Sequence, residues 1–230
     1  MIESASAWRL IFSGEPSLYA IAYLSLKVSV CAVLIAGLIG LPLGALLGFS
    51  NFRGRNALVV ITNALMGLPP VVVGLCVYLA LSRSGPLGFL GVLFTPTAMV
   101  IAQAILITPI IAALTRQTVE DLWSEYQNEF KAMGVSRMGC LAALLYDARI
   151  SLITALLAGF GRAAAEVGAV MIVGGNIDGF TRTMTTAIAL ETSKGDMAMA
   201  MGLGVMLIAI VIAINASTWI LSSFTKRRMG

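Results

Sequence analysis

Two ionisable side chains, Arg162 and Glu166, lie deeper in an apolar stretch than any others in the sequence. A charged side chain near the centre of a bilayer costs about 2.5–3.5 kcal/mol on insertion scales, so both are expected to face protein or water. Their spacing of four residues would place them on one helix face as an ion pair. Two interpretations stay open: a salt bridge that fixes or gates a helix bundle, and an arginine that attracts an anion along a path.

Other reactive constellations are missing from the sequence. The chain has no histidine, and Cys31, Cys76 and Cys140 lack the spacing of zinc or disulfide sites. There is no Gly-x-x-x-x-Gly-Lys-Ser/Thr phosphate loop, so the chain is not expected to hydrolyse ATP itself. No basic tract with interleaved aromatic residues favours nucleic-acid binding. We therefore predict no catalytic residue, no metal site and no cofactor in this chain.

Prolines interrupt two further apolar stretches. Pro69 and Pro70 stand within the second stretch and Pro109 within the third. Proline removes a helix hydrogen bond and bends the chain, and broken helices often line the path of a transporter. Pro69 and Pro70 are therefore candidate path residues, with a plain kink as the alternative.

The composition places these residues in a membrane. Of 230 residues, 59% are hydrophobic and 11% are charged, whereas soluble domains carry about 25% charged residues. Segments long enough to span, about 20 residues each, are 28–49, 58–81, 96–114, 150–173 and 197–221. We predict an all-α, polytopic transmembrane helix bundle of about five spans, forming a single domain over residues 1–230.

The distribution of basic residues sets the orientation. One side holds nine of them: Arg53, Arg55, Arg116, Lys131, Arg137, Arg149, Lys226, Arg227 and Arg228. The other side holds four: Arg9, Arg83, Arg182 and Lys194. Because the more basic side is cytoplasmic, the N-terminus is predicted outside and the C-terminus inside. Residues 1–17 contain two acids against one base and are not expected to be a cleavable signal.

The one long cytoplasmic loop, residues 115–149, contains an amphipathic helix. Its apolar positions recur at three-to-four spacing: Val119, Leu122, Trp123, Tyr126, Phe130 and Met133. Gly134 is expected to end this helix as a C-terminal cap. The aromatic face needs cover from other spans, the lipid surface or a partner, so both an interfacial helix and a docking element are possible.

On the outer side, residues 174–196 are polar and are expected to fold back over the bundle. Residues 176–196 hold two bases against three acids, whereas a loop that captures a dianion would be net positive. We therefore predict an outer gate and landing surface, with Arg182 and Lys194 at its rim, and no tight anion site. In the first span, Gly40 and Gly44 form a weak GxxxG signal for close helix contact.

Several segments together resemble the permeases of type I ATP-binding-cassette importers, in the molybdate, tungstate and sulfate group. Residues 129–137, EFKAMGVSR, resemble the family's loop that docks into the ATPase subunit; Asn128 replaces the usual Glu, and Asp147 the closing Pro. The coupling residues implied are Glu129, Lys131, Ala132, Gly134, Ser136, Arg137 and Asp147. The resemblance runs from about residue 20 to 222, and its outer part implies path or gate candidates at Arg162, Glu166, Asn176, Thr181, Arg182 and Thr183.

The resemblance also implies the rest of the machine. Two copies of the chain would form the path in a prokaryotic inner membrane, and an ABC ATPase dimer using ATP and Mg would bind the cytoplasmic loops. An extracytoplasmic binding protein would deliver the oxyanion. Within the group, segments 166–176 and 184–196 are most similar to tungstate permeases; Val167 and Asp178 stand where molybdate and sulfate relatives have Phe and Pro. The alternatives are molybdate or sulfate as cargo and, from another class, an ion-coupled secondary transporter.

Overall fold

The computed structural model of the chain describes residues 16–227 and the side chains of residues 18–217. Residues 1–17 are predicted not to be a cleavable signal, and most of them, including Arg9, lie outside the described residues. Arg228, which was counted for the orientation, also lies outside them, and for Lys226 and Arg227 only the backbone is described.

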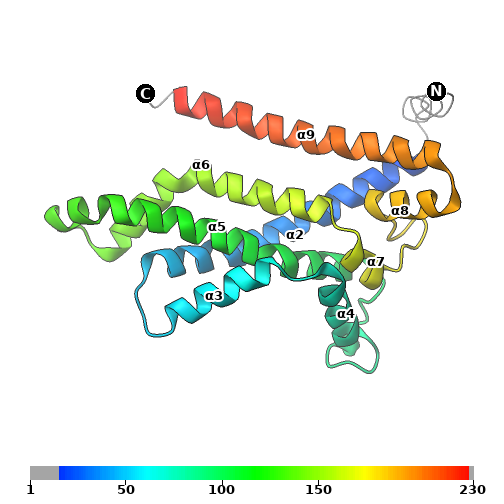
Figure 1. Cartoon of the computed structure of the whole chain (residues 1–230), viewed down its shortest axis with the longest axis horizontal. Helices are drawn as coiled ribbons and strands as arrows, with labels where there is room; N and C mark the ends of the chain where they lie inside the picture. Colours follow the sequence, from blue (N-terminus) through cyan, green and yellow to red (C-terminus); the bar gives the residue numbers. More distant parts are fainter. Residues whose placement is uncertain (1–15, 228–230) are drawn as a thin grey trace. The chain divides into compact units, whose positions relative to one another are not determined.

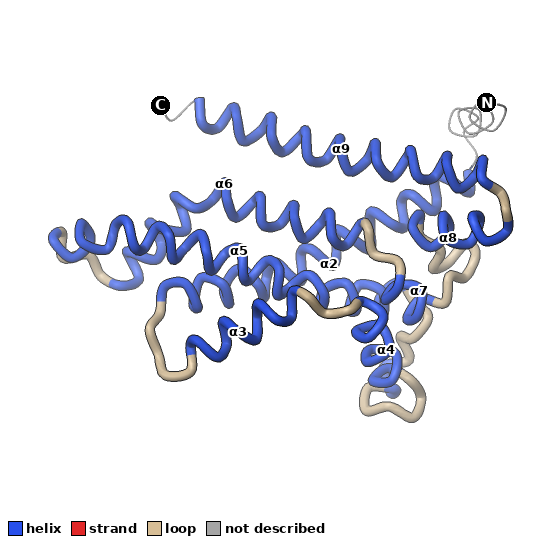
Figure 2. The backbone as a smooth tube through the Cα atoms, viewed as in Figure 1, coloured by secondary structure: helices blue, strands red, loops and turns tan. Residues whose placement is uncertain are grey.

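The regular structure of the described residues is entirely helical, as predicted, and the helices are joined by turns and loops (Figures 1 and 2). The elements are α2 (Pro16–Phe49), α3 (Arg55–Met66), α4 (Pro70–Leu81), η1 (Gly88–Leu90), α5 (Pro96–Ala132), α6 (Arg137–Ala164), α7 (Gly168–Gly174), α8 (Met184–Lys194) and α9 (Met197–Arg227). Four of them, α2, α5, α6 and α9, are long and apolar enough to cross a membrane, and α3 with α4 makes a fifth candidate if counted as one bent span.

Several helix boundaries differ from the predicted ones. The third predicted span continues as α5 to Ala132, because its apolar part passes directly into the amphipathic helix. The fourth was placed at residues 150–173, but α6 begins at Arg137 and ends at Ala164, and residues 168–174 form the separate helix α7. The predicted outer loop 174–196 contains the eleven-residue helix α8. Hydropathy measures apolar length only, so it misses both helix continuations and helix breaks.

The proline predictions have different outcomes. The second span is broken between Met66 and Pro70, and Pro70 is the first residue of α4, where its missing N–H costs nothing. Pro109, in contrast, lies inside α5, which is helical on both sides of it.

The chain forms two compact units. Among the described residues, unit 1 comprises 16–31, Pro70–Gln103 and 164–227, and unit 2 comprises Ala32–Pro69 and Ala104–Ala163. In unit 1, Leu18 and Ala22 of α2 pack with Met184 of α8 and Leu203 of α9. Helices α4 and α7, labelled close together in Figure 1, also pack on each other; a methyl group added at Gly74 would lie 2.7 Å from the Cα of Ala169.

A glycine stripe brings α2 against α5 in unit 2. An added Cβ at Gly40 would lie 3.0 Å from the carbonyl oxygen of Thr108, and one at Gly48 would lie 2.7 Å from that of Arg116. An added Cβ at Gly44 would lie 2.6 Å from Cβ of Thr115. These contacts leave no room for a side chain, so the weak GxxxG signal marks a real close approach of two helices.

Replacing Gly44 with alanine should therefore destabilise the protein. The new methyl group overlaps atoms of α5, and overpacking of this kind costs about 1–3 kcal/mol. We expect the melting temperature of the purified chain in detergent to fall by roughly 2–12 °C. Gly161→Ala is the matched control, because Gly161 lies within α6 and no atom of the described residues comes within 4 Å of an added Cβ there. An unchanged melting temperature for Gly44→Ala would show that the two helices separate freely.

Candidate functional site

The turn between α5 and α6 carries most of the predicted coupling residues on its surface. All seven are exposed: Glu129, Lys131, Ala132, Gly134, Ser136, Arg137 and Asp147. The first six lie in or directly beside the turn, and Asp147 lies ten residues further along α6. Met133 and Met138 are 65% and 76% exposed. The turn therefore presents charged side chains together with flexible apolar ones.

A left-handed glycine and two local hydrogen bonds form this turn. Gly134 has φ +63°, the left-handed conformation expected of a glycine that ends a helix. The N–H of Val135 donates to the carbonyl oxygen of Phe130 at 3.2 Å, which closes the last turn of α5. The hydroxyl of Ser136 accepts the N–H of Gly139 at 3.2 Å and caps α6. The predicted helix end at Gly134 is confirmed.

The aromatic face of α5 is covered by the chain itself. Val119, Leu122, Trp123, Tyr126 and Phe130 pack with residues of α2 and α6. The ring centroids of Phe49 and Trp123 lie 4.8 Å apart at an edge-to-face angle of 72°. Other helices of the chain therefore cover the aromatic face of α5, and not the lipid surface or a partner. The face gives no support for docking to a partner. Met133 alone among the predicted apolar positions stays largely exposed.

An ion cluster that sequence reasoning missed lies in the same unit. The carboxylate of Glu120 pairs with Arg55 of α3 through one oxygen and with Arg116 of α5 through the other. Arg55 also donates to the carbonyl oxygen of Leu47, near the end of α2, at 2.7 Å. The cluster thus links α2, α3 and α5. Only the Arg116–Glu120 spacing of four residues could have been read from the sequence.

Arg162 and Glu166 do not share a helix, so the prediction that they lie on one helix face is wrong, and the pairing of their charges stays a prediction. Arg162 lies in the last turn of α6, whereas Glu166 lies in the break that follows it. The Glu166 side chain is 4% exposed, and its carboxylate accepts the N–H of Ala169 at 3.0 Å. The carboxylate thereby satisfies an amide in the first turn of α7.

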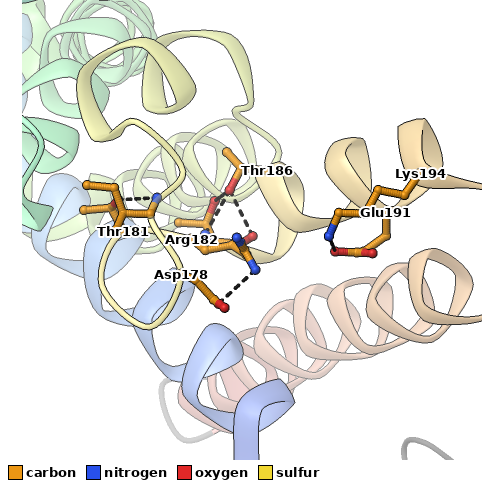
Figure 3. Close-up of polar contacts among 8 residues, drawn as sticks. Asp178, Thr181, Arg182, Thr186, Glu191 and Lys194 are labelled. Carbon is orange, nitrogen blue, oxygen red and sulfur yellow. Dashed lines mark hydrogen bonds and ion pairs between the residues drawn. The ribbon is translucent and has the colours of Figure 1, made fainter. Parts of the chain in front are cut away.

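Figure 3 shows the segment between α7 and α8, where Thr181 is fully buried. Its hydroxyl donates to the carbonyl oxygen of Gly174 at 2.6 Å and accepts the N–H of Ile177 at 2.9 Å. Asn176 has φ +49°, a conformation that asparagine tolerates better than most residues. Thr181 therefore has a structural role in this conformation, because its hydroxyl bonds to residues on both sides of Asn176. Asn176 itself is partly buried.

A buried hydroxyl cluster begins α8. The N–H of Thr183 donates to the hydroxyl of Thr186 at 3.0 Å in a capping box. Thr185 donates to the carbonyl oxygen of Glu166 at 2.8 Å, and Ser25 of α2 accepts the N–H of Met184 at 2.7 Å. These bonds hold α8 to two distant segments of unit 1. Thr183, at 4% exposure, is thus placed in a structural network.

The two basic residues between 176 and 196, Arg182 and Lys194, are each paired with an acid (Figure 3). Arg182 contacts Asp178 at 2.8 Å, and Lys194 contacts Glu191 at 2.9 Å. Their charges are partly neutralised within the chain, which agrees with the balance of acids and bases counted from the sequence.

Comparison with known proteins identifies the family. The pattern of the binding-protein-dependent transport system inner membrane component matches residues 40–230. The chain is 43% identical to a tungstate uptake system permease protein of Peptoclostridium acidaminophilum, over 92% of both chains. It is 38% identical to a tungstate uptake system permease protein of Campylobacter jejuni, over 91% of this chain and 87% of that one. It is 26% identical to the molybdenum transport system permease protein of Escherichia coli, over 90% and 94%. The chain therefore belongs to the family of inner membrane components of binding-protein-dependent transport systems.

Proposed function

We propose that this permease forms the path by which tungstate enters the cell. The observation that carries the proposal is the difference in identity among relatives: 43% and 38% to two tungstate uptake permeases, against 26% to a molybdenum permease over a similar length. Molybdate is the second candidate because that relative still aligns over nearly the whole chain. Sulfate, the other alternative of the group, has no specific support from these relatives.

The proposed orientation places the N-terminus outside and the C-terminus in the cytoplasm. It is supported by the count of basic residues along the sequence. Nine were assigned to the inner side and four to the outer side, and of the outer four Arg83, Arg182 and Lys194 are described. Because positive charge favours the cytoplasmic side, the turn between α5 and α6 would face the cytoplasm and the segment between α7 and α8 the outside.

In this arrangement the α5–α6 turn is the docking element for a separate ATPase subunit, which uses ATP and Mg. Its exposed methionines suit an adaptable contact, since methionine fits irregular partner surfaces. The charged residues around them, Glu129, Lys131 and Arg137, would set the register of docking through rim contacts.

A second copy of the chain would complete the path. Thr62 is the only buried residue of α3. Asn63 is exposed on this helix, and lies eight residues, about 12 Å of helix, beyond the charged Arg55. Polar side chains at membrane depth usually face protein or water. Helix α3 is therefore proposed to face a second copy or the path itself, near the break at Pro69 and Pro70. Asn63 is a path candidate that hydropathy alone did not indicate.

Transport by the reconstituted complex tests the substrate. The permease, its ATPase and its binding protein would be placed in liposomes, and ATP-dependent uptake of tungstate would be measured with molybdate or sulfate as competitor. We expect tungstate to be taken up in preference. Equal or better uptake of molybdate would transfer the assignment to the second candidate, and uptake without ATP would contradict the importer.

Residues 176–196, which we propose to face the outside, should bind tungstate weakly by themselves. Arg182 and Lys194 are already paired with acids, and two bases face three acids between residues 176 and 196. Titration of tungstate into the purified permease without its binding protein should show no tight site. Arg182→Ala should instead slow association of the binding protein and weaken its salt dependence. Tight tungstate binding that disappears in Arg182→Ala would make Arg182 a substrate ligand.

A further inference from the structure

The turn between α4 and α5 has an unusual composition. Its ten residues, 85–94, are all glycine, proline, leucine, phenylalanine or valine, and we call this segment the apolar turn. It follows directly on Ser82, Arg83 and Ser84, so polar and apolar residues are sharply separated along the chain. No side chain of the apolar turn can donate or accept a hydrogen bond.

Large side chains of the apolar turn are exposed. Phe89 is 81% exposed, Leu90 48%, Leu87 43% and Phe94 40%. Apolar surface left in water is unfavourable in proportion to its area. Contiguous apolar surface of this kind marks contact with a partner or with a membrane.

The backbone of the apolar turn is largely satisfied within the chain. The N–H groups of residues 85, 87, 88, 90 and 91 donate to nearby carbonyl oxygens at 2.8–3.1 Å. The N–H of Phe94 donates to the carbonyl oxygen of Val173 in α7 at 2.9 Å. Irregular backbone near hydrocarbon is tolerated only when its polar groups are paired, and the apolar turn largely meets that condition.

The apolar turn is also closely packed against the end of α4. A Cβ at Gly85 or Gly88 would collide with backbone carbonyl oxygens of Leu79 and Ser82 respectively. The ring of Phe94 packs edge-on against Tyr78 of α4, with centroids 6.0 Å apart. The exposed side chains are thus held outward on a compact turn.

We propose that the apolar turn inserts into the interfacial region of the bilayer, with Phe89 and Leu90 among the acyl chains and Arg83 at the headgroups. An interface with a protein partner has a polar rim and about one hydrogen bond per 100–200 Å² of buried interface. The apolar turn has no side-chain group that could supply either. The segment between α7 and α8 does offer such groups, at Asn176, Asp178 and Arg182. Insertion of the apolar turn requires neither a particular substrate nor a particular orientation of the chain.

Tryptophan quenching by lipid tests the insertion. Phe89→Trp would be placed in nanodiscs whose phosphatidylcholine carries bromine either close to the headgroup or near the chain ends. The contribution of the native Trp8, Trp123 and Trp219 is subtracted with the unchanged chain. The added emission should lose roughly half or more of its intensity with the shallow bromines, because the ring would lie within about 5–10 Å of the headgroup boundary. The deep bromines should quench it less.

Two further variants complete the test. Leu90→Trp should behave in the same way, and it covers the case that Phe89→Trp does not fold. Met133→Trp is the matched control, since Met133 is 65% exposed in the charged α5–α6 turn and should not be quenched. Emission from positions 89 and 90 that neither lipid quenches would mean that water or protein covers the apolar turn, and would overturn the proposal.

Discussion

Replacing Gly134 with arginine should abolish coupling between ATP hydrolysis and transport while leaving the permease folded. Among the described residues, no atom lies within 4 Å of an added Cβ at Gly134, so the start of the new side chain meets no clash there. At φ +63° it adds backbone strain of about 1–2 kcal/mol. If the turn lies in a packed interface with the ATPase, a bulky charge there should lower substrate-stimulated ATPase activity at least about tenfold.

Two comparison variants separate strain from docking. Asparagine tolerates the left-handed conformation, so Gly134→Asn should keep most of the activity. Gly54→Arg introduces the same side chain at another left-handed glycine of unit 2, also with no atom within 4 Å. It should couple normally. Normal transport and ATPase co-purification in Gly134→Arg would contradict the docking role, and equal loss in Gly54→Arg would show that strain or charge alone is responsible.

The parts that could be predicted from the sequence depend on local rules. A three-to-four repeat followed by Gly134 indicated a helix and its end, and Gly40 with Gly44 indicated a close helix contact. Apolar length located most of the long helices. In each case the information lies within one segment or in one residue type.

Contacts between distant segments could not be read in this way. Glu120 and Arg55 are 65 positions apart, and Ser25 and Met184 are 159 apart. The end of α6 at Ala164 is equally hidden, because residues 162–173 remain apolar enough to continue a helix, and the chain departs from it where Glu166 bonds to Ala169. The cover of the aromatic face depends on which helices pack against α5. A list of apolar positions does not contain that information.

Glu166→Ala should be among the most damaging single changes in unit 1. It removes the acceptor from the N–H of Ala169, which is fully buried, and an unpaired buried donor costs about 1–3 kcal/mol. It also leaves a void where a 4%-exposed side chain was, which adds to the loss. Because Ala169 packs against Gly74, disorder at the start of α7 should reach α4 and lower both thermal stability and transport.

Comparison with two more variants separates the cap from the ion pair that the sequence suggested. Glu166→Gln keeps an amide oxygen that can accept the N–H of Ala169, so if the cap dominates, its melting temperature should stay close to that of the unchanged chain. If charge pairing with Arg162 dominates, Glu166→Gln should be nearly as unstable as Glu166→Ala. The double variant Glu166→Ala with Arg162→Met should then recover stability, because it removes both charges together. Melting temperatures in detergent decide between the two. If Glu166→Ala were as stable as the unchanged chain, neither role would hold and the buried carboxylate would have to serve transport alone.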